Sequence, residues 1–184
     1  TNPTTIYLGG GTPSTLPASL LERIFDSLDK NFNLSNIEEV TIECNPDDLN
    51  KDYISGLKNL PINRLSMGIQ TFNEEELKVL GRRHNASNAI KAVENVYNSG
   101  IENISIDLMY ALPNQSLKTW ESNLDIALKL PISHISAYHL SYEEDKVDAF
   151  SSMNIIDGRE YFIITIDDMS SFFRQQFSLA HEIG

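Results

Sequence analysis

The strongest constraint on the fold is a repeated alternation between short apolar runs and longer segments of helical period. The runs are rich in Ile, Leu, Val, Met and Thr, are short enough for strands buried on both faces, and occupy residues 5–8, 39–43, 64–69, 103–109 and 134–140. Apolar side chains recur every three or four positions between them, at residues 17–30, 50–60, 73–99 and 117–130, which predicts amphipathic helices. Strand–helix–strand connections of this length require parallel pairing and right-handed crossovers. The pattern therefore predicts an α/β sheet or a (β/α) barrel.

The length of the chain limits how complete such a barrel is. A barrel of eight units needs roughly 250 residues, whereas this chain has 184, so we expect a partial barrel. Residues 1–142 form the predicted core. Beyond it, residues 143–148 are charged, 150–158 resemble a loop, and 159–177 are apolar enough for a sixth helix or for mixed structure. We interpret 143–184 as a C-terminal extension of unassigned fold.

The ends of the predicted helices carry suitable capping residues. Asn73, Ser116 and either Asn50 or Asp52 are predicted N-caps, because their side-chain oxygens can accept hydrogen bonds from backbone N–H groups left free in the first turn. Glu76, three residues after Asn73, completes a sequence that resembles a capping box. Gly100 stands where the residue after a helix C-terminus often has a left-handed conformation.

The composition disfavours several classes of protein. With 14 Lys and Arg against 26 Asp and Glu, the net charge is −12, and nucleic-acid binding needs clustered basic residues. No apolar run approaches the roughly 20 residues of a membrane span, and the first residues carry no basic and apolar leader. We therefore expect a cytoplasmic protein without a membrane span and without a nucleic-acid partner.

Metal ligands are sparse in the sequence. The single cysteine, Cys44, excludes an intrachain disulfide and cannot alone hold zinc or an iron–sulfur cluster. The histidines follow no metal-binding spacing and are expected to be structural; they are His84, His134, His139 and His181. Any metal site therefore needs residues that this sequence does not contain.

Polar residues follow each predicted strand, where ligands bind in parallel α/β folds. These segments are 9–13, 43–46, 68–72, 107–115 and 138–141. Three consecutive glycines, Gly9–Gly11, expose backbone groups to an amino-acid-like or phosphate-like head. The alternative is a tight turn, and the segment lacks both the dinucleotide fingerprint and the nucleotide-triphosphate loop.

Individual polar residues at these strand ends each allow a structural and a functional interpretation. A carboxylate at Glu43 must pair or bind, because its burial without a partner costs several kcal/mol. It suits ribose hydroxyls, or a salt bridge with Arg64, Arg82 or Arg83. The amide of Gln70 can donate and accept hydrogen bonds to a ligand at once, or Gln70 can cap the rim of the barrel. Asp107 orients a ligand or caps the next helix. Arg82 offers a planar fork to a carboxylate, or is a solvated arginine at a helix end.

Taken together, the motifs resemble a known family. They are Tyr7–Ser14 (YLGGGTPS), 43–46 (ECNP), 67–72 (MGIQTF), 80–84 (LGRRH) and 107–115 (DLMYALPNQ). In this order they resemble the radical S-adenosylmethionine proteins of the oxygen-independent coproporphyrinogen III oxidase family. The resemblance spans about residues 4–142 and is specific because the motifs occur in the family's order, at or just beyond predicted strand ends.

The resemblance implies a partial (β/α)6 barrel that binds S-adenosylmethionine (SAM) against a four-iron, four-sulfur (4Fe-4S) cluster. It implies that the glycine loop holds the methionine amino group, that Arg82 pairs with the methionine carboxylate, and that the other residues complete the cofactor site. The implied cofactor-binding residues are Gly10, Gly11, Thr12, Glu43, Gln70, Arg82, Asp107 and Ser141. The family's three cluster cysteines precede the glycine loop, so we expect them upstream of Thr1 and interpret the chain as lacking its N-terminal part.

Two branches of the family imply different activities. One is an enzyme that cleaves SAM with an electron from a donor protein and oxidatively decarboxylates coproporphyrinogen III; no further catalytic residue is assigned. The other is a haem chaperone, which residues 43–46, 80–84 and 136–140 favour. Porphyrinogen or haem is thus the implied partner. A third hypothesis, from outside the family, is a β/α barrel fragment that binds a phosphorylated metabolite at the glycine loop.

Overall fold

The structure is a computed structural model that describes residues 3–140, 149–156, 159–166 and 177–182. The chain divides into two compact units, and each is described by itself. One unit comprises Thr1–Leu8 with Thr12–Leu140, and the other comprises Gly9–Gly11 with Ser141–Gly184. Among the described residues, no helix combines the length and apolar character needed to cross a bilayer.

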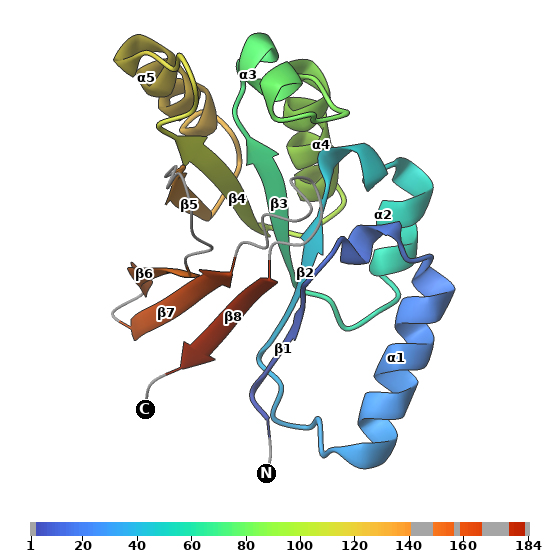
Figure 1. Cartoon of the computed structure of the whole chain (residues 1–184). Coiled ribbons are helices and arrows are strands. Elements are labelled where there is room, and N and C mark those ends of the chain that lie inside the picture. The colour runs from blue at the N-terminus through green and yellow to red at the C-terminus, as the bar shows by residue number, and fades with distance from the viewer. Residues whose placement is uncertain (1–2, 141–148, 157–158, 167–176, 183–184) are drawn as a thin grey trace. The chain divides into compact units, whose positions relative to one another are not determined.

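The first unit is built on a five-stranded parallel sheet with strand order β1-β2-β3-β4-β5 (Figure 1). The strands are β1 (Thr5–Leu8), β2 (Glu39–Cys44), β3 (Arg64–Gln70), β4 (Asn103–Tyr110) and β5 (His134–His139). All five predicted strands are confirmed, with ends that differ by one residue at most. Each strand neighbours the next one in sequence, as in a partial β/α barrel.

Helices connect the strands of this sheet. They are α1 (Ala18–Asn31), α2 (Lys51–Leu57), α3 (Glu74–Val79), α4 (Ala86–Asn98) and α5 (Leu117–Ala127), with short 3-10 turns η1 (Pro13–Thr15) and η2 (Pro46–Asp48). The prediction of one helix over 73–99 is wrong, because the chain breaks between α3 and α4 at Gly81, whose φ is +62°. The predicted N-caps Asn73 and Ser116 are confirmed, and of the two alternatives for α2 the cap is Asn50 and not Asp52. Each of the three side chains accepts hydrogen bonds from backbone N–H groups.

The two faces of the sheet differ in chemistry. On the face packed in the core, alternate residues are apolar and buried: Val40, Ile42, Cys44, Leu65, Met67, Ile69, Ile104, Ile106 and Leu108. The intervening residues point to the opposite face and are polar there. Thr41, Ser66 and Ser105 on that face are buried as well, so the strands are buried on both faces as predicted, but only one face is apolar.

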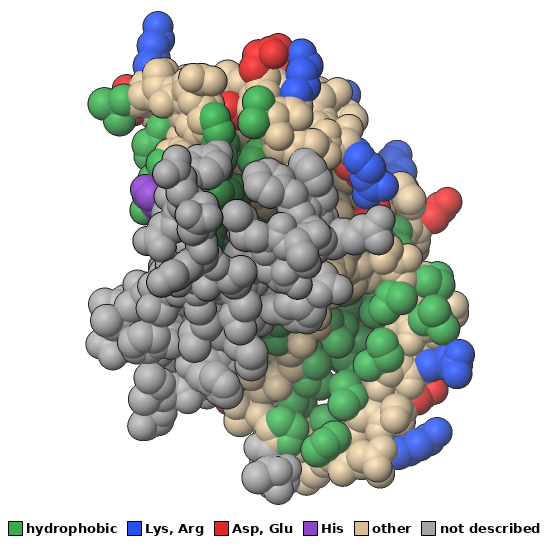
Figure 2. Space-filling model, viewed as in Figure 1, with side chains coloured by type: hydrophobic (Ala, Val, Ile, Leu, Met, Phe, Trp, Pro, Cys, Tyr) green, Lys and Arg blue, Asp and Glu red, His purple; other side chains and the backbone are tan. Residues whose placement is uncertain are grey.

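Some apolar side chains of the first unit remain exposed. Leu20 and Ile24 lie on α1, and Phe32 follows its last turn. Figure 2 shows hydrophobic side chains gathered over the region of β1 and α1.

The second unit contains a three-stranded antiparallel sheet, β6 (Ala149–Ile156), β7 (Arg159–Ile166) and β8 (Phe177–Glu182). The predicted loop over 150–158 is therefore wrong, and so is a helix beginning at 159. Residues 161–166 read Tyr-Phe-Ile-Ile-Thr-Ile, and such β-branched and aromatic side chains favour strands. The apolar character of this segment fits a helix or a strand, and its β-branched and aromatic residues are what favour the strand.

Candidate functional site

Acidic and hydroxyl side chains align across the polar face of the sheet. Strand register places Gly68, Asp107 and Ser136 side by side on β3, β4 and β5. The carboxylate of Asp107 accepts hydrogen bonds from Ser136 and Ser66. Gly68 and Asp107 lie just past the middle of their strands, toward the carboxyl edge, which is the edge where parallel sheets bind ligands.

Glu43 lies beside this row and is held by Tyr7. The Tyr7 hydroxyl donates to Glu43 Oε1 at 2.8 Å, from β1 to β2. Burial raises the pKa of Tyr7, and the nearby carboxylates of Glu43 and Asp107 add to the effect. Among the arginines expected as alternative partners of Glu43, Arg64 lies 3.5 Å from Glu39, and Arg83 lies 3.2 Å from Asp48.

The local field makes Asp107 an unusual carboxyl group. Burial, and then repulsion by Glu43, raise its pKa to about 7, although the bonds from Ser136 and Ser66 and the charge of Arg64 act in the opposite direction. Burial and the charge of Asp107 also raise the pKa of Tyr138. This face therefore carries a proton that titrates near neutrality, and it attracts cations once Asp107 is ionised.

Arg82 is brought to the same edge by the turn that ends α3. Gly81 N–H donates to Lys78 O at 3.0 Å, and Arg82 N–H donates to Leu77 O at 2.9 Å. This pair of bonds is a Schellman motif, which needs a left-handed residue such as Gly81 at its centre. The guanidinium then reaches β3, where its Nη2 donates to Gly68 O at 2.6 Å.

Gln70 meets Arg82 above Gly68. A Cβ added to Gly68 would lie 3.1 Å from Gln70 Nε2 and 3.4 Å from Arg82 Nη2, so the missing side chain leaves room for both groups. Gln70 has a left-handed φ of 72°, at an irregularity in the β3–β4 register. Its side chain is only 7% exposed, and its Oε1, like Arg82 Nε, has no hydrogen-bond partner in the described part of the chain. A buried acceptor and a buried donor thus remain available at one place.

The structure describes the remaining predicted residues only in part. Gly10 and Gly11 follow β1 with φ values of +83° and +64°, a conformation that explains why glycine stands there. Thr12 precedes η1, and its carbonyl accepts from Thr15 N–H at 3.0 Å. Ser141 lies outside the described residues. The binding roles of all these residues stay predictions, as do those of Glu43, Gln70, Arg82 and Asp107.

Several residues of this face were not predicted to bind the cofactor. Tyr7, Ser66, Ser136 and Tyr138 occupy the same face as Glu43 and Asp107, but Tyr7 and Ser136 were part of motifs only, Tyr138 was one of the polar residues at a strand end, and Ser66 was not singled out. Their signal was present as polar residues at alternate positions of otherwise apolar strands, a pattern typical of one polar face. Asn45 was noted only as part of a motif, although its Oδ1 accepts from Arg82 Nη2 at 2.8 Å.

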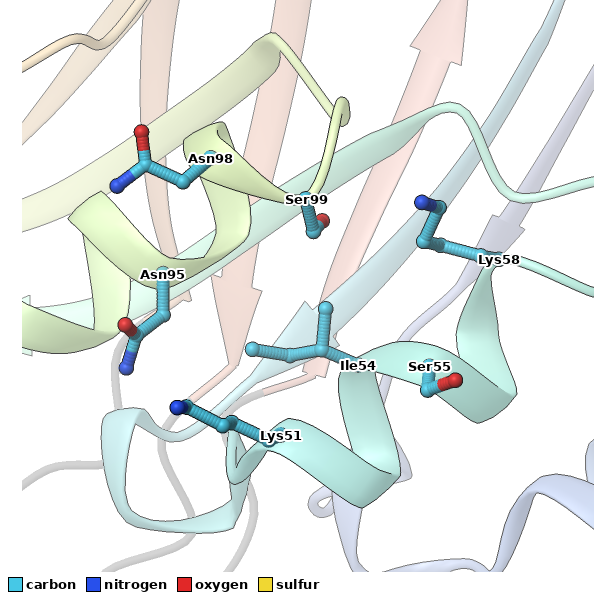
Figure 3. Close-up of a pocket in the computed structure, with 7 residues that line it drawn as sticks. All are labelled: Lys51, Ile54, Ser55, Lys58, Asn95, Asn98 and Ser99. Atoms are coloured by element: carbon cyan, nitrogen blue, oxygen red, sulfur yellow. The ribbon is translucent and has the colours of Figure 1, made fainter.

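The described residues also form a groove on the helical side of the sheet. It has a volume of about 400 Å3 and lies between α2 and α4 (Figure 3). Its lining residues are Lys51, Ile54, Ser55, Lys58, Asn95, Asn98 and Ser99. The groove includes none of the predicted cofactor-binding residues, so the polar face of the sheet is the candidate site.

Metal ligands are not gathered in the described part of the chain, where no group of three His, Cys, Asp or Glu side chains is positioned to hold an ion. Cys44 is buried, and burial raises the pKa of its thiol. A single cysteine cannot supply the three thiolates that an iron–sulfur cluster usually takes. The described residues therefore do not offer a ligand set for a cluster.

Fold and side-chain chemistry together define a partial β/α barrel whose strands carry acidic and hydroxyl groups toward their carboxyl edge. The chain belongs to the Radical SAM superfamily, whose sequence model matches residues 3–127. This confirms the family resemblance and the fold class inferred from the motifs.

Individual relatives show which members of the superfamily this chain is similar to. The chain is 42% identical over 143 residues to the "Heme chaperone HemW" of Lactococcus lactis and 39% identical over 144 residues to that of Bacillus subtilis; each match covers 78% of this chain and 38% of the relative. Among solved structures, coproporphyrinogen III oxidase (HemN) from Escherichia coli has a TM-score of 0.70 at 27% identity, covering 76% of this chain and 32% of that chain. The chain therefore spans less than half the length of these relatives.

Proposed function

We propose that this chain provides the SAM-binding surface of a radical SAM protein of haem metabolism, of the haem chaperone type. The observation that carries the proposal is the meeting of Arg82, Gln70, Glu43 and Asp107 at one edge of the sheet. Arg82 Nε and Gln70 Oε1 are buried there and have no hydrogen-bond partner among the described residues. Buried polar groups are normally hydrogen-bonded, and a bound ligand would satisfy these two.

The chemistry of SAM matches this set of groups. A guanidinium such as Arg82 suits the methionine carboxylate, and the carboxylates of Glu43 and Asp107 suit ribose hydroxyls and a cationic sulfonium. The amide of Gln70 both donates and accepts. Backbone groups of Gly10, Gly11 and Thr12 would hold the methionine ammonium, and Ser141 would add a further contact.

The cofactor pair sets the reaction class. When bound, a 4Fe-4S cluster supplies the electron for reductive cleavage of SAM, and an electron donor protein would in turn supply the cluster. With a single cysteine, this chain cannot provide a three-cysteine ligand set, so the cluster would be held by residues outside it. The part played by the residues described here is to bind and orient SAM.

Haem carriage is favoured over decarboxylation by the relatives. The curated relatives named haem chaperones are 36–42% identical to this chain, whereas the solved oxidase is 27% identical. We therefore propose haem as the cargo and the cytoplasm as the compartment. The oxidase, acting on coproporphyrinogen III, is the alternative that the structural neighbour supports.

Neighbouring arginines provide a direct test of the cofactor site. Replacing Arg82→Ala should weaken SAM binding by roughly 1.5 to 3 kcal/mol, about 10- to 150-fold, because a charge-assisted hydrogen bond is lost. Arg83→Ala should leave the affinity unchanged, because Arg83 pairs with Asp47 and Asp48. Isothermal titration of the anaerobically reconstituted full-length gene product measures both. Equal affinities for the two variants would remove Arg82 from the site.

The same preparation separates the two activities. Stoichiometric haem binding, seen as a Soret band, without decarboxylation of coproporphyrinogen III is the result expected for a carrier. Release of 5′-deoxyadenosine together with decarboxylated porphyrinogen would instead establish the oxidase.

A further inference from the structure

The strongest observation that the proposed function leaves unused is a hydrogen-bond chain behind Arg82. Both hydrogens of Arg82 Nη2 are engaged, one by Gly68 O at 2.6 Å and one by Asn45 Oδ1 at 2.8 Å. A guanidinium carries donors only, so the amide of Asn45 must present its oxygen. Two fixed acceptors on one nitrogen determine the plane in which the guanidinium lies.

Asn45 is itself held firmly from the other side. It follows β2 and precedes η2, and its backbone N–H donates to Ser14 Oγ at 3.1 Å. Ser14 is buried, and its hydroxyl in turn donates to Asp48 Oδ2 at 2.6 Å. Asp48 N–H closes the turn on Asn45 O at 3.1 Å. Asn45 thus sits in a short rigid turn rather than on a mobile loop.

The two neighbouring arginines, Arg82 and Arg83, have different hydrogen-bond and ion-pair partners. Arg83 pairs with Asp47 and Asp48, at 3.7 and 3.2 Å, on the solvent side of η2. Within the described part of the chain, Arg82 donates only to the neutral oxygens of Asn45 and Gly68. The carboxylates of Asp47, Asp48 and Asp107 act on its charge through space but do not hydrogen-bond to it there. A neutral anchor fixes the direction of the guanidinium and leaves its charge for a ligand.

From this arrangement we infer that Asn45 is a positioning residue that aims Arg82, and through it sets the selectivity of the site for a ligand that carries a carboxylate. The inference rests on the proposed function, since it takes SAM as the ligand. It assigns to Asn45 no contact with the cofactor. Its effect is transmitted through the guanidinium, so it should disappear when Arg82 is absent.

Two ligands and a pair of variants test this inference. SAM and decarboxylated SAM differ only in the carboxylate, and their dissociation constants are measured by titration of the reconstituted full-length protein. Asn45→Ala should weaken SAM binding about tenfold and change binding of decarboxylated SAM by less than twofold. In an Arg82→Ala background, adding Asn45→Ala should change neither constant. Asn95→Ala, on α4 beside the outer groove, is the matched control and should match the wild type.

A second variant guards against a loss of folding. Asn45→Asp keeps the shape and the acceptor of the side chain but places a negative charge beside the Arg82 guanidinium. This charge competes with the carboxylate of SAM, so the preference for SAM over decarboxylated SAM should again fall about tenfold. An unchanged preference in both variants overturns the inference, as does equal weakening of both ligands by Asn45→Ala or an effect that persists without Arg82. If Arg82→Ala weakens SAM binding while Asn45→Ala does not, only the positioning role fails. If the wild type binds neither ligand, the proposed function fails with it.

Discussion

Asp107 shows how a single residue depends on its surroundings. From sequence, it was a polar residue in an apolar run, with a ligand-orienting role or a helix cap as alternatives. The structure gives the cap of α5 to Ser116 instead and places Asp107 among Glu43, Ser66 and Ser136. Sequence spacing identifies the residue, but a pKa depends on neighbours from other strands, which only the register of the sheet determines.

The raised pKa of Asp107 predicts a pH-dependent contribution to stability. Its value of about 7 lies above the ordinary 3.8, so between these pH values the folded chain holds a proton that the unfolded chain has released. The resulting stabilisation is complete below about pH 4 and is lost as the pH rises through about 7. The variant Asp107→Asn cannot ionise, so its free energy of unfolding relative to the wild type should rise over this range.

Urea unfolding of both proteins between pH 4 and 8 measures the effect. The free energy of unfolding of Asp107→Asn should rise relative to that of the wild type by at most about 4 kcal/mol, since each unit of pKa shift corresponds to about 1.4 kcal/mol. The exposed Asp29 on α1 provides the control, because Asp29→Asn should show no such rise. A difference between Asp107→Asn and wild type that is flat with pH would contradict the altered environment.

At the scale of elements, the turn between α3 and α4 contributes most to the site. Sequence periodicity runs through 73–99 and hides the break, because Gly81 alone is a weak signal against a continuous apolar stripe. The Schellman bonds of Gly81 and Arg82 show what the glycine does. The capping box at Asn73 was also only half right: Asn73 caps α3, whereas the carboxylate of Glu76 accepts from Gln115 at 3.1 Å and from Thr71.

This turn predicts different effects for two equivalent glycine substitutions. Gly81 and Gly100 both have positive φ, at +62° and +98°, so alanine at either should lower the free energy of unfolding by about 1 kcal/mol. Only Gly81→Ala should also weaken SAM binding, because only Gly81 sets the position of Arg82. Thermal unfolding and SAM titration of both variants distinguish the two effects. An equal loss of affinity in Gly100→Ala would mean that general destabilisation, and not the turn, is responsible.

For the molecule as a whole, the sequence was sufficient to predict the parallel sheet and the polar residues that follow its strands. The alternation of strands and helices and the polar residues after each strand contained that information. It was insufficient for the second unit, where apolar residues 159–166 fit a helix as well as the strand β7. Short apolar runs are ambiguous between the two. The grouping of side chains on the polar face was also not predicted, because alternation along one strand does not show which residues of neighbouring strands lie side by side. The strand register is needed for that.

We propose above all that SAM binds on the polar face of the five-stranded sheet. A crystal structure of the full-length protein with SAM bound tests it most directly. We expect the methionine carboxylate within hydrogen-bonding distance of Arg82 and the nucleoside beside Glu43, Gln70 and Asp107. SAM bound in the groove between α2 and α4, or away from Arg82 altogether, would contradict it.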